Sequence, residues 1–167
     1  METKQIHLGI PFFNDGTAFS ETLASLEKMI LVNLNSKEYK ICTLIYNDGS
    51  SSQESERLFD LVQKSEYFRS SCEIYTGETN YGYGFAVRTL QEIALEKKSD
   101  LLIIIDSELS MRPEDISSLV KLWWQPEYLK GENPYIFKPS RFSTPSGSEN
   151  ILGVRKLWSW AGNKVSR

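Results

Sequence analysis

The sequence predicts a single-domain α/β protein in three layers, with helices on both faces of a mostly parallel sheet. Short aliphatic runs alternate along the chain with longer segments whose apolar residues recur every three or four positions. Strands separated by helices are joined by right-handed crossovers, which make the strands parallel. A length of 167 residues, 40% of them apolar, is enough for one hydrophobic core of this kind.

Five short apolar runs are expected to form the strands. Each is followed within two residues by glycine, proline, asparagine or aspartate, which commonly end strands in turns. The fourth run is five aliphatic residues without interruption, a pattern typical of a strand buried on both faces. The expected strands are residues 5–10, 39–46, 72–75, 101–105 and 135–138.

The segments between these runs carry helical periodicity and helix-start signals. Thr17 is expected to cap the first helix, the serines at 50–52 offer a cap for the second, and Pro113 suits the first turn of the fourth. The apolar stripe of the first helix is formed by Phe19, Leu23, Leu26 and Ile30. The expected helices are residues 18–34, from the serines to about 65, 85–97, 113–123 and 150–167.

Charge is unevenly distributed along the chain. Residues 1–137 carry 13 basic and 21 acidic side chains, a net charge of −8, whereas residues 138–167 carry six basic and one acidic, a net charge of +5. The basic segment suits an anionic partner at the C-terminal end. A nucleic-acid partner is not expected, because the body is acidic and the basic segment is short.

The cysteines and the N-terminus bear on the compartment. Cys42 and Cys72 lie in separate expected strands without metal-ligand spacing, which indicates reduced core thiols and favours the cytoplasm. The first seven residues are polar, and no apolar run approaches the roughly 20 residues that a membrane span needs. Any membrane contact is therefore expected to be peripheral.

Polar side chains follow the first four expected strands. Because the carboxyl ends of parallel strands meet at one edge of a sheet, these side chains are expected to form a nucleotide pocket there. Two carboxylates after the fourth strand indicate a hard divalent ion, since Mg²⁺ typically takes one or two carboxylates and completes its shell with water and phosphate. The residues are Asn14 and Asp15, Asn47 and Asp48, Asn80 and Arg88, and Asp106 and Glu108.

Taken in order, these motifs resemble the family 2 glycosyltransferases, which have the Rossmann-like GT-A nucleotide-sugar-binding fold. The general match rests on Ile10-Pro11-Phe12-Phe13-Asn14, Asn47-Asp48-Gly49-Ser50, Asn80-Tyr81-Gly82-Tyr83-Gly84 and Asp106-Ser107-Glu108. More narrowly, residues 106–114 resemble the "DADLSHxPE" signature of dolichol- or polyprenyl-phosphate mannosyltransferases. Ser140-Arg141-Phe142 resembles their "SRY", and Arg155-Lys156-Leu157-Trp158-Ser159 with Asn163 resembles their "RKxxS…N".

The resemblance implies a metal-dependent inverting transferase that moves a mannose- or glucose-type sugar from a GDP- or UDP-sugar to a polyprenyl or dolichyl phosphate. The whole chain, 1–167, would be one glycosyltransferase-like domain, with a nucleotide-sugar-binding core at 1–138 and an acceptor loop and basic amphipathic helix at 139–167. Its expected location is the cytoplasm, peripherally at the cytoplasmic face of a membrane.

Site roles follow from the same resemblance. The residues expected to bind Mg²⁺ or Mn²⁺ are Asp106, Glu108 and Ser110. Those expected to act in catalysis are Asp106, Glu108, Arg141 and Arg155. The donor site is expected to use Pro11, Phe13, Asn14, Asp15, Asn47, Asp48, Gly82, Gly84, Arg88 and Asp106. The acceptor phosphate is expected to contact Arg141, Arg155 and Ser159.

Departures from the family pattern leave alternatives open. Asn47 stands in place of an aspartate, Glu108 in place of an aspartate and Met111 in place of a histidine. The chain also ends soon after Asn163, so a C-terminal truncation is expected. The alternatives are a family 2 transferase with a saccharide acceptor and a non-catalytic nucleotide-binding remnant. Among the site residues, Arg88 could instead pair with an acid on its own helix.

Overall fold

A computed structural model describes residues 3–34, 36–108 and 111–125. The strands of this part are β1 (Lys4–Phe12), β2 (Tyr39–Asp48), β3 (Cys72–Gly77) and β4 (Leu101–Ile104). Its helices are α1 (Gly16–Asn33), α2 (Ser52–Lys64), α3 (Glu66–Ser71), α4 (Tyr83–Glu96) and α5 (Pro113–Trp123). The strand expected at 135–138 and the helix expected at 150–167 lie outside the described residues.

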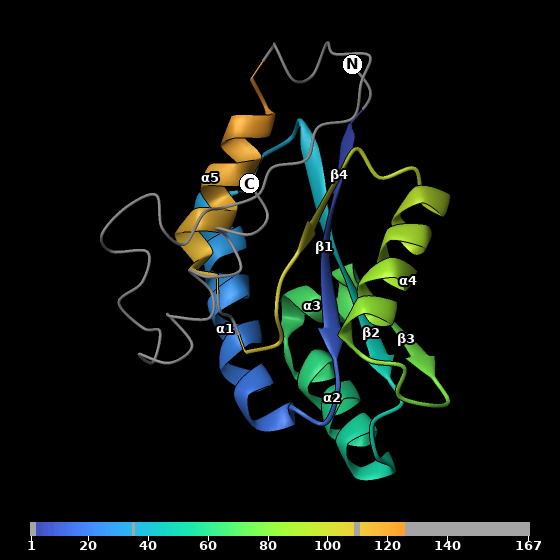
Figure 1. Ribbon diagram of the computed structural model, residues 1–167. Helices are drawn as coiled ribbons and strands as arrows, with labels where there is room; N and C mark the ends of the chain where they lie inside the picture. The colour runs from blue at the N-terminus through green and yellow to red at the C-terminus, as the bar shows by residue number, and fades with distance from the viewer. Residues whose placement is uncertain (1–2, 35, 109–110, 126–167) are drawn as a thin grey trace, which may run out of the picture. The chain divides into compact units, whose positions relative to one another are not determined.

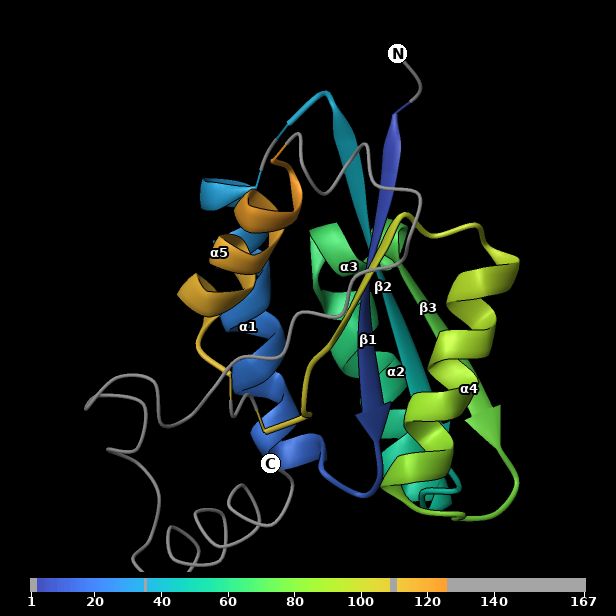
Figure 2. The same ribbon diagram turned by 45° about the horizontal axis from the view of Figure 1, so that its top comes forward.

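The strands form one parallel sheet in the order β3-β2-β1-β4 (Figure 1). The chain steps from β1 to β2 to β3 in one direction. It then returns past β2 and β1, so that β4 lies on the other side of β1. Right-handed crossovers with this reversal put α1, α2 and α3 on one face of the sheet and α4 on the opposite face. Figures 1 and 2 show this arrangement, with α5 beside α1. The predicted three-layer α/β/α architecture is confirmed.

Strand alternation divides the core into two layers. Leu44 and Tyr46 of β2 pack with α4, whereas Phe12 of β1 contacts Phe19 of α1 at a ring-centroid distance of 5.2 Å on the other face. The predicted stripe of α1 is confirmed, because all of its members are buried: Phe19, Leu23, Leu26 and Ile30. Since successive side chains of a strand point to opposite faces, neighbouring residues at a strand's end have different surroundings.

β1 extends further than the sequence predicts, because Pro11 does not end it. Pro11 and Phe12 stay in register with Tyr46 and Asn47 of β2. The carbonyl of Gly9 accepts a hydrogen bond from the amide of Ile105, so the backbone groups of Gly9 face β4. The backbone groups of successive strand residues point to opposite neighbours, and those of Pro11, two residues further on, therefore also face the side of β4. The pairing with β4 stops at Gly9. The missing N–H of Pro11 therefore removes no ladder hydrogen bond.

Some helix starts follow local signals and others do not. Ser51 caps α2 by accepting a hydrogen bond from the amide of Glu54 at 3.3 Å, and Pro113 opens α5, as predicted. Thr17 is not the cap of α1, because the helix begins at Gly16 and its N-cap residue is Asp15, which makes no side-chain capping bond. Tertiary partners replace the local cap.

Two further differences concern element boundaries. α4 begins at Tyr83, two residues earlier than expected, with Gly82 as its N-cap at a φ of 89°. α3 was not expected from the sequence, because its six residues are too few to display helical periodicity. The Ser65 hydroxyl caps α3, and Phe68 anchors it in the core with none of its surface exposed.

Candidate functional site at the carboxyl edge of the sheet

Hydrogen bonds link the segments that follow the four strands into a closed ring at the carboxyl edge of the sheet. We call this set the loop ring; it consists of residues 13–15 after β1, 47–51 at the end of β2 and just beyond it, 78–82 with the start of α4 after β3, and 105–108 after β4. Each segment is bonded to two others, as described in turn below. Most of the predicted donor-site residues lie in the loop ring.

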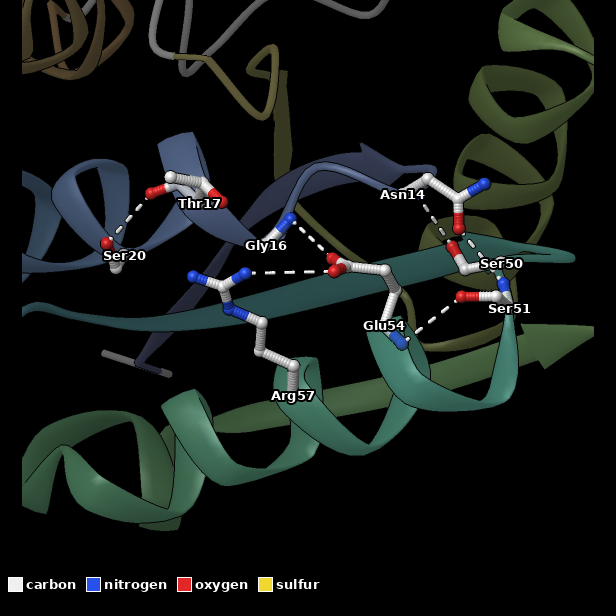
Figure 3. A network of polar contacts seen from close by, with 8 residues as sticks. All are labelled: Asn14, Gly16, Thr17, Ser20, Ser50, Ser51, Glu54 and Arg57. Carbon is white, nitrogen blue, oxygen red and sulfur yellow. Dashed lines mark hydrogen bonds and ion pairs between the residues drawn. The ribbon is translucent and has the colours of Figure 1, made fainter.

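The segment after β1 is fastened to the start of α2. Asn14, with a φ of 50°, donates its amide to the Ser50 hydroxyl at 3.0 Å, and its side-chain oxygen accepts from the Ser51 amide at 3.0 Å. The Glu54 carboxylate accepts from the Gly16 amide at 2.9 Å. Arg57 pairs with Glu54 at 3.7 Å (Figure 3). The predicted donor residue Asn14 is therefore positioned by the two serines that precede α2, and Glu54 of α2 holds the backbone just beyond Asp15.

Asn47 and Asp48 are both buried, and they face opposite sides of the sheet. The Asn47 amide group bonds toward α2, donating to the Ser55 hydroxyl at 2.9 Å and accepting from the Ser50 amide at 3.1 Å. The Asp48 carboxylate faces α4 and accepts from the amides of Tyr81 at 3.1 Å and Gly82 at 2.7 Å. Both predicted donor residues thus hold the loop ring together, and their contact with a nucleoside stays a prediction.

Gly49 brings the turn after β2 against the loop before α4. Its φ is +69°, and a Cβ at this position would lie 2.4 Å from the carbonyl carbon of Thr79 and 2.5 Å from the amide nitrogen of Asn80. These are backbone atoms that a side chain could not displace. Only glycine therefore permits both the turn and this close approach.

Tyr83 joins the start of α4 to the end of β4. Its hydroxyl donates to the Asp106 carboxylate at 3.0 Å. Leu102 and Ile104 pack on the α4 side of the sheet, and the strand alternation places Asp106 on that side as well. Partial burial and the Asp106 carboxylate raise the pKa of the Tyr83 phenol to about 12, so it keeps the proton it donates at neutral pH.

Ser107, the next residue, closes the loop ring on the other face. Its hydroxyl donates to the Asp15 carboxylate at 2.6 Å, and its carbonyl accepts from the Thr22 hydroxyl at 2.6 Å. Asp106 and Ser107 thus tie the segment after β4 to α4 on one side and to α1 on the other. This segment carries the predicted metal-binding carboxylates.

Asp106 and Glu108 offer oxygen atoms of the kind that a divalent ion takes as ligands. Glu108 is exposed, Asp106 is half-buried, and both present the hard oxygen ligands that Mg²⁺ and Mn²⁺ prefer. Among residues 3–34, 36–108 and 111–125, no group of three or more His, Cys, Asp or Glu side chains could hold a metal. An ion at this pair would complete its shell with water and substrate phosphate, as Mg²⁺ commonly does.

The remaining predicted site residues have different surroundings. Pro11 is buried in β1 and Phe13 is 44% exposed just beyond it. Gly82 is the N-cap of α4, and a Cβ at Gly84 would meet no atom within 4 Å. Arg88 pairs with Glu92 one turn further along α4 at 3.0 Å, the alternative that the sequence left open. The predicted residues that lie outside the described part are Ser110, Arg141, Arg155 and Ser159.

Sequence reasoning missed the residues that bridge the segments of the loop ring. Ser50, Ser51 and Ser107 read as ordinary turn and cap residues, and Tyr83 stood only within a glycine-rich motif. The sequence did carry a sign of the face on which Asp106 lies, because Asp106 follows Leu102 and Ile104 by four and two residues and so shares their side of the strand. Only the position of α4 on that face, however, brings the two side chains together.

The fold and this site define an α/β protein with polar loops and a carboxylate pair at the carboxyl edge of a parallel sheet. The model of the family "Glycosyl transferase family 2" matches residues 8–164. The chain therefore belongs to glycosyl transferase family 2, as the sequence motifs indicated. No curated protein matches the sequence.

A solved structure shares the fold. It is a mannosyltransferase from Pyrobaculum calidifontis, determined in complex with GDP-Man and Mn²⁺, with a TM-score of 0.57 and 13% sequence identity. The match covers 75% of this chain and 34% of that protein, so this chain spans about a third of its length. The likeness confirms the predicted GT-A fold. In the described part of the chain, no helix has the length and apolar character needed to cross a membrane.

Proposed function

We propose that the chain is a metal-dependent inverting glycosyltransferase that moves a mannose- or glucose-type sugar from a GDP- or UDP-sugar to a polyprenyl or dolichyl phosphate. The observation that carries the proposal is the carboxylate pair Asp106 and Glu108, held at the sheet edge by the loop ring in a chain of family 2. Mannosyl transfer is supported by the GDP-Man and Mn²⁺ bound in the structure that shares the fold.

The donor would lie over the loop ring with its diphosphate toward Asp106 and Glu108. These carboxylates would hold Mg²⁺ or Mn²⁺, with Ser110 as a further ligand, and the ion would neutralise charge on the leaving diphosphate. The residues 11–15 and the 47–48 pair would flank the nucleoside. Because the loop ring is already fastened by hydrogen bonds, this part of the site would need little ordering when the donor binds.

The acceptor chemistry needs no general base. A polyprenyl phosphate is largely ionised at neutral pH, so its oxygen can attack the anomeric carbon directly. The new carbon–oxygen bond forms as the bond to the diphosphate breaks, which inverts the anomeric centre and releases the nucleoside diphosphate. Arg141, Arg155 and Ser159 would orient the acceptor phosphate and stabilise the departing charge. This acceptor would place the chain at the cytoplasmic face of a membrane.

Calorimetry with the Asp106→Asn variant tests the metal-dependent donor site. The unchanged chain is expected to bind GDP-Man or UDP-glucose in the presence of Mn²⁺, and the variant is expected to lose this metal-dependent binding while its melting temperature stays unchanged. Asp60→Asn is the matched control, because Asp60 is an exposed aspartate on α2. Equal donor affinity in Asp106→Asn and the unchanged chain would refute the site.

A transfer assay identifies the acceptor. Membranes containing polyprenyl phosphate are supplied with radiolabelled nucleotide sugar, and label in an acid-labile lipid phosphate is the expected product. Label appearing only in an added soluble saccharide would instead assign a saccharide acceptor. If the chain binds no nucleotide sugar in the presence of Mg²⁺ or of Mn²⁺, it is a non-catalytic member of the family.

A further inference from the structure

Tyr83 closes the loop ring at the carboxylate that the proposed function assigns to the metal. It belongs to the first turn of α4, which the chain reaches after β3, whereas Asp106 follows β4. The Tyr83 hydroxyl donates a hydrogen bond to the Asp106 carboxylate at 3.0 Å. In the described part of the chain, this bond connects α4 to the segment after β4 that carries the proposed metal ligands. The Tyr83 side chain is not part of the hydrophobic core, because the residue is 59% exposed.

The surroundings of Tyr83 fix where its hydroxyl can reach. The N-cap of its helix, Gly82, donates its amide to the buried Asp48 carboxylate at 2.7 Å and to the Asn80 side-chain oxygen at 2.8 Å. Behind it, Ala86 and Leu90 pack α4 against the sheet. The start of α4 is thus held on both sides, and the Tyr83 ring projects from a fixed backbone toward the end of β4.

We propose that Tyr83 is a positioning residue, whose hydroxyl orients the Asp106 carboxylate for binding the divalent ion. This inference rests on the proposed function, since it concerns the same metal. Partners that hydrogen-bond a ligating carboxylate fix its orientation, and their loss typically lowers metal affinity by about 10- to 100-fold. Because Tyr83 is exposed and water can replace its hydroxyl, the effect should lie at the low end of that range.

Tyr83→Phe is the variant that tests this role, since it removes the hydroxyl and keeps the ring. The matched control is Tyr75→Phe, which removes another phenol-to-carboxylate hydrogen bond on the same face of the sheet, from Tyr75 to Glu73 at 2.8 Å. Mn²⁺ affinity is measured on the full chain by electron paramagnetic resonance, with free Mn²⁺ as the signal. Asp106→Asn provides the reference for a lost ligand.

The expected result is a dissociation constant for Mn²⁺ about tenfold higher in Tyr83→Phe, an unchanged value in Tyr75→Phe and a much larger loss in Asp106→Asn. Saturating Mn²⁺ should restore the donor affinity of Tyr83→Phe, which a general disturbance of the fold would not allow. If the unchanged chain binds Mn²⁺ and Tyr83→Phe binds it equally well, the positioning role is wrong while the proposed function stands. If the unchanged chain binds no Mn²⁺, with or without GDP, both are overturned.

Discussion

Replacing Asp48 by alanine should destabilise the fold through the loop that precedes α4. The carboxylate is 3% exposed and accepts the amides of Tyr81 and Gly82. A hydrogen bond to a charged group contributes about 1.5–3 kcal/mol. The Gly82 amide keeps a second acceptor, the Asn80 side chain at 2.8 Å, whereas the Tyr81 amide loses its partner. The total loss should therefore lie at the lower end, near 3 kcal/mol for the two bonds.

A loss of about 3 kcal/mol corresponds to a decrease of roughly 150-fold in the folding equilibrium constant. With a urea m-value near 2 kcal/mol/M, the unfolding midpoint should fall by about 1.5 M. Asp48→Asn should lose about half as much, because it retains one carbonyl acceptor. Asp60→Ala is the control, since replacing an exposed side chain usually changes stability by less than about 0.5 kcal/mol.

The outcome separates two roles for Asp48. An unchanged midpoint in Asp48→Ala would refute the reasoning that this carboxylate anchors the loop. If donor affinity then fell without any loss of stability, Asp48 would act as a nucleoside contact, as the family resemblance implies. A loss of both is expected if the anchored loop also shapes the donor site.

Two further predictions concern backbone geometry and pH. Gly49→Ala should lower the free energy of unfolding by about 2 kcal/mol or more, because this position combines a φ of +69° with a backbone clash. Gly84→Ala should be neutral or stabilising, since its Cβ would meet no atom within 4 Å. Equal urea midpoints for the two variants would contradict this. Burial, followed by the charge of Lys97, lowers the pKa of His7 below its ordinary value. The unfolded chain therefore binds the proton first, so the stability due to neutral His7 is present above about pH 6.5 and is lost as the pH falls toward the folded pKa. His7→Gln should flatten the dependence of urea midpoint on pH across that window, and a slope equal to that of the unchanged chain would remove His7 as the cause.

Much of the fold could be predicted because local patterns and topology rules agree. The uninterrupted aliphatic run before Asp106 specifies a strand, and the stripe through Phe19 and Leu26 specifies an amphipathic helix. The burial expected on both faces of that strand is not seen among the described residues, because β4 lies at the end of their sheet and only Ile103 of its four residues is buried. Right-handed crossovers then leave few arrangements of alternating elements. Boundaries were less predictable where tertiary contacts replaced local signals, as at the start of α1, where Glu54 accepts the Gly16 amide.

For the candidate site, the sequence alone determined the residue types and the edge of the sheet where they gather. Asp48 and Asp106 could be assigned to that edge because they follow the ends of parallel strands. Only the tertiary structure decided their partners. Strand alternation sends Asn47 toward α2 and Asp48 toward α4, and the reversal after β3 brings Tyr83 to Asp106 and leaves Ser107 to meet Asp15. Apart from the bond between Asn47 and Ser55, these contacts join residues far apart in the chain, so no local pattern encodes them.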